Sequence, residues 1–78
     1  MSEEPAVEML SKIGARIAYY RRLRDLKQID LAMEVGISEQ YLSRIERGHQ
    51  PKGLTIYTLL KIAEKLDVNM RDFIDETE

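Results

Sequence analysis

A single glycine between two short amphipathic segments constrains the fold of this chain more than any other feature. Apolar residues recur at helical spacing in residues 28–35 and again from residue 39 onward, with Gly36 between them. Glycine takes a positive φ without steric cost, so it permits a short turn between two helices that cross steeply. Helices that meet so closely need a small side chain at their contact, which Ala32 supplies, and Ser38 can cap the second helix.

Residues 28–47, the window that contains both segments, also carry apolar side chains where a shared core would need them. These are Leu31, Val35, Ile37, Leu42 and Ile45. Together with the alanine and the glycine, and in the required order, they favour a helix-turn-helix over residues 28–47. A generic small helical bundle is the alternative.

The segment before this window is predicted to be one helix from Pro5 to about Arg24. Aspartate tolerates a left-handed backbone better than most residues, so Asp25 is expected to end it. Its inward face is formed by residues that follow one another at steps of three and four, namely Leu10, Ile13, Ile17 and Tyr20.

The segment after the window is predicted to contain two more helices. Gly48 ends the third helix, and a loop covers residues 49–54. Thr55 is placed to cap a helix over residues 56–66, and a last short helix is expected over residues 69–74. The inward residues of the fourth helix are expected to be Ile56, Leu59, Leu60, Ile62 and Ala63. No strand pattern competes, so we expect an all-α fold of five helices.

Length and composition exclude several classes of protein. The 78 residues suffice for one domain with a small core, and they contain no cysteine for a disulfide or a thiolate metal site. His49 is the single histidine and has no cluster of ligands around it. No segment is apolar enough for a membrane span, and the acidic N-terminus does not fit a signal peptide. We therefore expect a cytoplasmic protein, not an enzyme, with no metal, cofactor or evident small-molecule ligand.

The distribution of charge points toward a polyanion, although the net charge does not. The chain carries −2 overall, which argues against nucleic acid. Residues 16–52, however, carry +3, between a stretch 1–15 at −2 and a stretch 53–78 at −3. A basic centre between acidic ends is a weak signal for nucleic acid, and a solvated charged surface is the alternative.

Residues 28–47 resemble the helix-turn-helix of the phage-repressor and Cro class, also called the xenobiotic-response-element type. The resemblance covers residues 13–74, with residues 1–12 extending the first helix and residues 75–78 forming an acidic tail. The matching positions outside the window's core are Arg16-Ile17, Arg21, Ser43 to Gly48 and Leu59 to Ala63. The resemblance implies a lambda-repressor-like DNA-binding domain. It also implies a structural ion pair of Arg21 with Glu46; two separate solvated charges are the alternative.

The resemblance further implies that the third helix lies in the major groove and reads base edges. A glutamine suits adenine and an arginine suits guanine, whereas Glu39 could accept from cytosine or only carry favourable charge at the helix N-terminus. The expected base-reading residues are Ser38, Glu39, Gln40, Ser43 and Arg44. The expected phosphate-binding residues are Lys27, Gln28, Arg47, His49 and Lys52.

Three departures from the family pattern bear on these expectations. Lys27 stands where the family usually has a serine or threonine cap, so a cap is lost and a cation gained. Asp25 replaces the usual glycine at the end of the first helix. The loop after Gly48 is longer than the common form, so its phosphate contacts cannot be transferred directly.

A homodimer is expected because one recognition helix reads few base pairs, and the family usually binds two half-sites. Met70, Phe73 and Ile74 offer a candidate dimer surface, unless they only close the monomer core. The expected function is therefore that of a small homodimeric transcriptional regulator, a nucleoid-associated repressor of double-stranded DNA operators. The rival is a protein-interaction module on the same fold, such as an antitoxin or antirepressor that acts on a regulatory protein partner.

Overall fold

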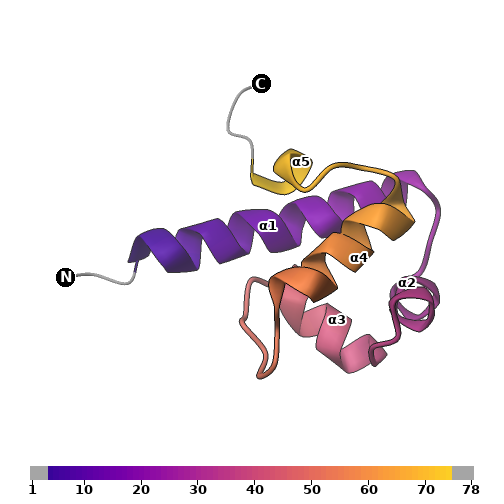
Figure 1. Cartoon of the computed structure of the whole chain (residues 1–78), viewed down its shortest axis with the longest axis horizontal. Coiled ribbons are helices and arrows are strands. Elements are labelled where there is room, and N and C mark those ends of the chain that lie inside the picture. Colours follow the sequence, from indigo (N-terminus) through magenta and orange to yellow (C-terminus); the bar gives the residue numbers. More distant parts are fainter. Residues whose placement is uncertain (1–3, 75–78) are drawn as a thin grey trace.

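The computed structural model describes residues 4–74 and consists of five helices (Figure 1). They are α1 (Glu4–Leu23), α2 (Gln28–Val35), α3 (Glu39–Glu46), α4 (Ile56–Leu66) and α5 (Arg71–Ile74). No strand occurs within these residues, and the predicted all-α fold with a helix-turn-helix is confirmed. The proposed acidic tail, residues 75–78, lies outside the described residues, and the domain limits 13–74 stay a prediction.

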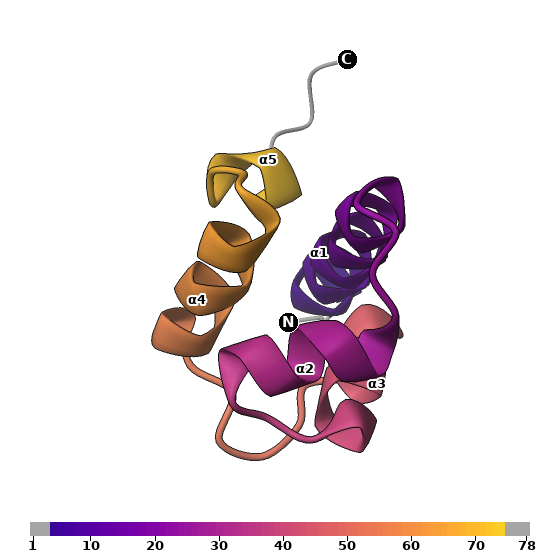
Figure 2. The same ribbon diagram turned by 90° about the vertical axis from the view of Figure 1, so that its right-hand side faces the viewer.

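The helices enclose one small core, to which every helix contributes. Seen in Figure 2, α4 and α5 lie on one side of the core, α1 on the other, and α2 and α3 close it below. Figure 1 views α2 nearly end-on while α3 lies across the page, so the two helices cross steeply, as predicted. The buried residues that form this core are Ile13, Ile17, Leu31, Ala32, Val35, Leu42, Ile45, Leu59, Ile62, Ala63, Leu66 and Phe73.

Residues with a left-handed backbone follow α1, α2 and α4. Gly36 has φ 88° and donates its N–H to Ala32 O at 2.8 Å, which closes α2 as the sequence predicted. Asp25 has φ 57° just after α1, also as predicted. Asp67 has φ 60° at the end of α4, which the sequence analysis did not anticipate. A short polar side chain that tolerates this backbone therefore replaces glycine at two of these turns.

The helix N-termini are capped in two different ways. Ser38 Oγ accepts the N–H of Tyr41 at 3.0 Å, which confirms the cap predicted for α3. At α2, Lys27 provides no such acceptor. Instead Asp30 Oδ2 accepts the N–H of Lys27 at 3.1 Å. The missing serine or threonine cap is thus partly replaced from within the first turn of α2.

The inward face of α4 is narrower than predicted. Ile56 is 63% exposed and Leu60 is 49% exposed, so both expectations of burial are wrong. The buried stripe of α4 passes through Leu59, Ile62 and Leu66 at steps of three and four. Ile56 and Leu60, four residues apart, lie together on the flank of that stripe. This leaves an apolar flank of α4 at the surface.

The α5 segment corrects one expectation about the dimer surface. Phe73 is fully buried and its ring lies 6.2 Å from that of Tyr20 on α1. A side chain with no exposed area cannot offer a surface to a second subunit, so the expectation is wrong for Phe73. Arg16 Nη1 also donates to Asp72 O at 3.3 Å. These contacts show that α5 closes the core of the monomer.

A glycine lets α1 and α3 approach very closely. A Cβ atom on Gly14 would lie 2.2 Å from Ile45 O and 2.8 Å from Glu46 O, far inside van der Waals contact. The preceding turn of α1 is close to the residues just after α3, since a Cβ on Gly48 would lie 2.8 Å from Ser11 Oγ. The C-terminal end of α3 is therefore held directly against the backbone of α1.

Candidate nucleic-acid interface

Three polar side chains of α3 and that of its C-cap residue Arg47 stand in helical register. Gln40, Ser43, Arg44 and Arg47 follow one another at i, i+3, i+4 and i+7, a spacing that puts them on one face; we call them the α3 outer face, in which Ser43 is half-buried and the others are exposed. The opposite face is buried through Leu42 and Ile45. Since packing fixes that buried face, α3 presents amide and guanidinium groups outward from a rigid helix.

The first turn of α3 contributes two more of the predicted residues, in different surroundings. Ser38 Oγ serves as the N-cap acceptor for Tyr41, so its remaining capacity to bind a base is reduced. Glu39 is exposed and stands at the N-terminus of the helix, where a negative charge is favourable. By helical spacing Glu39 lies beside the α3 outer face and is not part of it.

A basic hollow lies between the end of α3 and the loop that follows. Its volume is about 320 Å³. The loop is held by the Tyr41 hydroxyl, which donates to Lys52 O at 3.2 Å, and by the His49 N–H, which donates to Arg44 O at 3.0 Å. The lining residues are Arg44, Arg47, His49, Gln50, Pro51 and Lys52. Four of the predicted DNA-binding residues thus share one concave surface, and Gln50 joins them although the sequence analysis did not select it.

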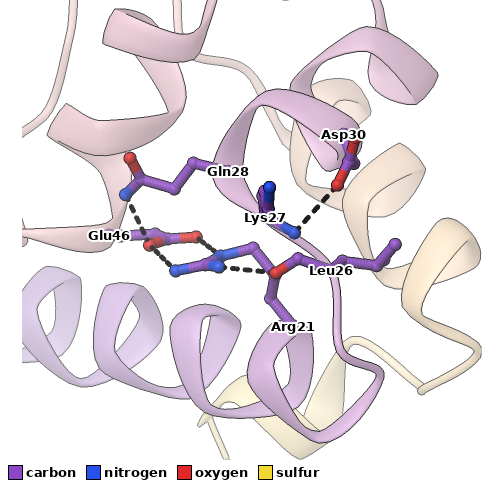
Figure 3. Close-up of polar contacts among 6 residues, drawn as sticks. All are labelled: Arg21, Leu26, Lys27, Gln28, Asp30 and Glu46. Atoms are coloured by element: carbon purple, nitrogen blue, oxygen red, sulfur yellow. Dashed lines mark hydrogen bonds and ion pairs between the residues drawn. The ribbon is translucent and has the colours of Figure 1, made fainter.

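Beneath α3, a polar network joins three helices (Figure 3). Arg21 Nε donates to Glu46 Oε2 at 2.7 Å and Arg21 Nη2 donates to Glu46 Oε1 at 3.1 Å. The remaining Arg21 Nη1 donates to Leu26 O at 2.7 Å. The two charged side chains are only 9% and 4% exposed. The structure therefore contains the Arg21–Glu46 ion pair, as a bidentate and nearly buried contact.

Gln28, the first residue of α2, also enters this network. Its Nε2 donates to Glu46 Oε1 at 2.9 Å, and its side chain is partly exposed. From the sequence, Gln28 was expected to be a phosphate contact separate from the ion pair. Lys27, one residue earlier, is exposed. Because Asp30 already accepts the Lys27 N–H, any phosphate contact of Lys27 has to come from its ammonium group.

The predicted DNA-binding residues gather at one end of the molecule. They come from the start of α2, from α3 and from the loop between α3 and α4, which both views place together at the end remote from α5 (Figures 1 and 2). Within residues 4–74 no group of His, Asp or Glu side chains could hold a metal ion. In the same range, no helix is both long enough and apolar enough to cross a bilayer.

Comparisons with known proteins find helix-turn-helix transcriptional regulators among the relatives of this chain. The uncharacterised HTH-type transcriptional regulator y4dJ of Sinorhizobium fredii is 32% identical over 72 residues, which is 92% of this chain and 91% of y4dJ. The HTH-type transcriptional regulator SinR of Bacillus subtilis is 38% identical over 64 residues. That match covers 82% of this chain but only 57% of SinR, so this chain spans little more than half the length of that relative.

Solved structures of similar proteins share the fold. The restriction-modification controller protein C.AhdI of Aeromonas hydrophila superposes with a TM-score of 0.74 at 31% identity, over 82% of this chain and 94% of that one. SinR, the master regulator for biofilm formation, in complex with DNA superposes with a TM-score of 0.72 at 36% identity, over 81% of this chain and 98% of that one.

The family assignment rests on a match that is longer than half of the chain. The profile of the helix-turn-helix family matches residues 17–73, from the middle of α1 to α5. That range contains the steep α2–α3 crossing, the α3 outer face and the Arg21–Glu46 pair. The chain therefore belongs to the helix-turn-helix family of transcriptional regulators.

Proposed function

We propose that this chain binds operator DNA sequence-specifically, with α3 in the major groove, and acts as a small homodimeric repressor on nucleoid DNA. The α3 outer face carries the proposal, because four polar side chains stand in register on a helix whose other face is fixed in the core. An α-helix fits the major groove, and glutamine and arginine are the side chains that pair there with adenine and guanine. The likeness to a SinR chain in complex with DNA supports DNA as the partner.

The interface residues then divide into two groups. Gln40 and Arg44 are the main base readers, with Ser43, Ser38 and Glu39 in secondary positions. Phosphate contacts come from cations and donors around this face, which fix the register of the protein on DNA. They are Lys27, Gln28, Arg47, His49 and Lys52, of which three line the basic hollow.

Arg44→Ala and Lys27→Ala are expected to impair binding in different ways. If Arg44 pairs with a guanine, its removal should cost about 1–3 kcal/mol on the preferred site and relax discrimination at one base pair. Removal of Lys27 should weaken binding to preferred and scrambled DNA alike and lower the salt slope by about one unit. The measurement is affinity as a function of salt for both duplexes, after selection of the preferred site from random DNA.

Both side chains are exposed, so circular dichroism of the two variants should match the unaltered chain. Wild-type affinity and selectivity in both variants would contradict the proposed docking of α3. The protein-interaction module would then become the better account, because the fold would be present without its DNA contacts.

The dimer surface is proposed to combine α5 with the apolar flank of α4. Ile74 is 40% exposed, and Met70 is partly buried against the core. The apolar flank of α4 adds Ile56 and Leu60, and the neighbouring Tyr57 is 66% exposed. Exposed apolar side chains favour association, and two half-sites on DNA require a symmetric partner.

Leu60→Glu is expected to shift the chain from dimer to monomer at micromolar concentration, because it places a charge in the apolar flank of α4. Met33→Glu on α2 is the matched control, since Met33 is 75% exposed and lies outside this surface. Analytical ultracentrifugation of both variants and of the unaltered chain gives the answer. A monomeric unaltered chain would refute the dimer, and equal dissociation of both variants would refute the surface.

A further inference from the structure

The carboxylate of Glu46 is shared between two partners from different helices. Arg21 on α1 occupies both of its oxygens, and Gln28 on α2 donates to Oε1 at 2.9 Å. Figure 3 shows the Gln28 amide nitrogen directed at Glu46 and the amide oxygen directed away from it. An ionised carboxylate can only accept hydrogen bonds, so this orientation of the amide is the one that the chemistry requires.

Gln28 keeps hydrogen-bonding capacity after this contact. A glutamine amide has two N–H groups, which diverge from one another, and Glu46 takes one of them. The side chain is partly exposed at the first residue of α2, next to the exposed Lys27. The second N–H therefore remains for another acceptor while the first is bound to Glu46.

We propose that Glu46 is a positioning residue that orients the Gln28 amide for donation to a backbone phosphate of DNA. The proposal rests on the proposed DNA-binding function and adds to it a link from the ion pair to the DNA backbone. Arg21 already satisfies the charge of Glu46 through two hydrogen bonds, so the fold does not depend on Gln28 for this purpose. What Gln28 gains is a fixed rotamer, which reduces the side-chain entropy lost on binding.

The mobility of the Gln28 amide tests the positioning without any DNA. Side-chain NH₂ order parameters from ¹⁵N relaxation should be near the rigid value of about 0.8 for Gln28 and below about 0.6 for an exposed amide. Gln40 and Gln50 are exposed glutamines of the same chain and serve as internal controls. A Gln28 amide as mobile as those two would overturn the proposal.

DNA affinity tests the phosphate contact. Gln28→Ala is expected to lose about tenfold in affinity on preferred and scrambled DNA, the size of one hydrogen bond to a charged group. The salt slope should stay unchanged, since a neutral amide releases no counterion, whereas Lys27→Ala lowers it. A purely structural Gln28 would change thermal stability and leave the affinity of the folded chain intact.

A variant that lacks the ion pair tests whether Gln28 acts through Glu46. In the variant Arg21→Met with Glu46→Leu, an apolar pair replaces the ion pair, a change that buried pairs often tolerate. In that variant Gln28→Ala should lower DNA affinity only about twofold, while Lys27→Ala should lower it as much as in the unaltered chain. A full tenfold loss in both backgrounds would overturn the role of Glu46.

These outcomes are distinct from a failure of the proposed function. If Arg44→Ala and Lys27→Ala lose DNA affinity as expected and Gln28→Ala loses none, this inference is rejected and the proposal of DNA binding is kept. An unaltered chain that binds no duplex DNA would reject DNA binding itself. If the apolar-pair variant does not fold, the order parameter and Gln28→Ala in the unaltered chain still decide the proposal.

Discussion

Glu46→Ala and Arg21→Ala are each expected to lower the free energy of unfolding by roughly 3–5 kcal/mol, the range for removing one partner of a buried ion pair. In Glu46→Ala the guanidinium would keep only its bond to Leu26 O, and in Arg21→Ala the carboxylate would keep only Gln28. Both charges are almost out of reach of water, which could otherwise compensate the loss. Denaturant unfolding followed by circular dichroism measures the effect.

The double variant and an exposed pair provide the controls. Arg21→Ala with Glu46→Ala should lose less than the two single losses added together, because no unpaired charge remains. Arg24→Ala should cost no more than about 1 kcal/mol, since its 3.4 Å contact with Asp67 is exposed. Simple additivity in the cycle would show that Arg21 and Glu46 do not interact in solution.

Gly14→Ala is expected to destabilise the chain by about 3 kcal/mol, at the upper end of the range for overpacking. The new methyl carbon would lie 2.2 Å from Ile45 O, and a backbone carbonyl cannot move aside as a flexible side chain can. Helix propensity alone predicts the opposite sign, a gain of about 0.8–1.0 kcal/mol for alanine over glycine within a helix. The sign of the change in unfolding free energy therefore separates the two effects.

Gly36→Ala is the matched control for this substitution. A Cβ atom there would have only Lys61 Nζ near it, at 3.9 Å, so its cost comes from the left-handed backbone alone. That cost is about 1–2 kcal/mol. A stabilised Gly14→Ala variant would mean that α1 and α3 are further apart in solution than the structure places them.

The sequence predicted those elements whose boundaries are marked by neighbouring residues. The bounds of α2 and α4 agree with the prediction, because Gly36 ends the first and Thr55 caps the second. Gly14 was not singled out, because its role depends on α3 crossing it. Ile56 and Leu60 were assigned to the core for a related reason, since an apolar residue beside a buried stripe looks the same in the sequence whether or not a neighbour covers it.

In the candidate site, too, only some of the features could be predicted from the sequence. The α3 outer face could be predicted because helical spacing alone places its four side chains, and the Arg21–Glu46 pair was implied by the family resemblance. The contact of Gln28 with Glu46 and the anchoring of the loop by the Tyr41 hydroxyl both join residues that no local pattern connects. Phe73 was assigned to a dimer surface because apolar residues near a chain end do not reveal which of them the core takes in.

The close packing of α3 against α1 has a consequence for the DNA partner. With the Ile45 carbonyl against Gly14 and the Glu46 carboxylate held by Arg21, α3 would have little freedom to tilt in the proposed complex, where it enters a groove. A mismatch between its orientation and the groove then has to be absorbed by the duplex, through bending or a change of groove width. Such deformation depends on base sequence even where no side chain touches a base. Operators would therefore be chosen partly for the stiffness of base pairs that the protein never contacts.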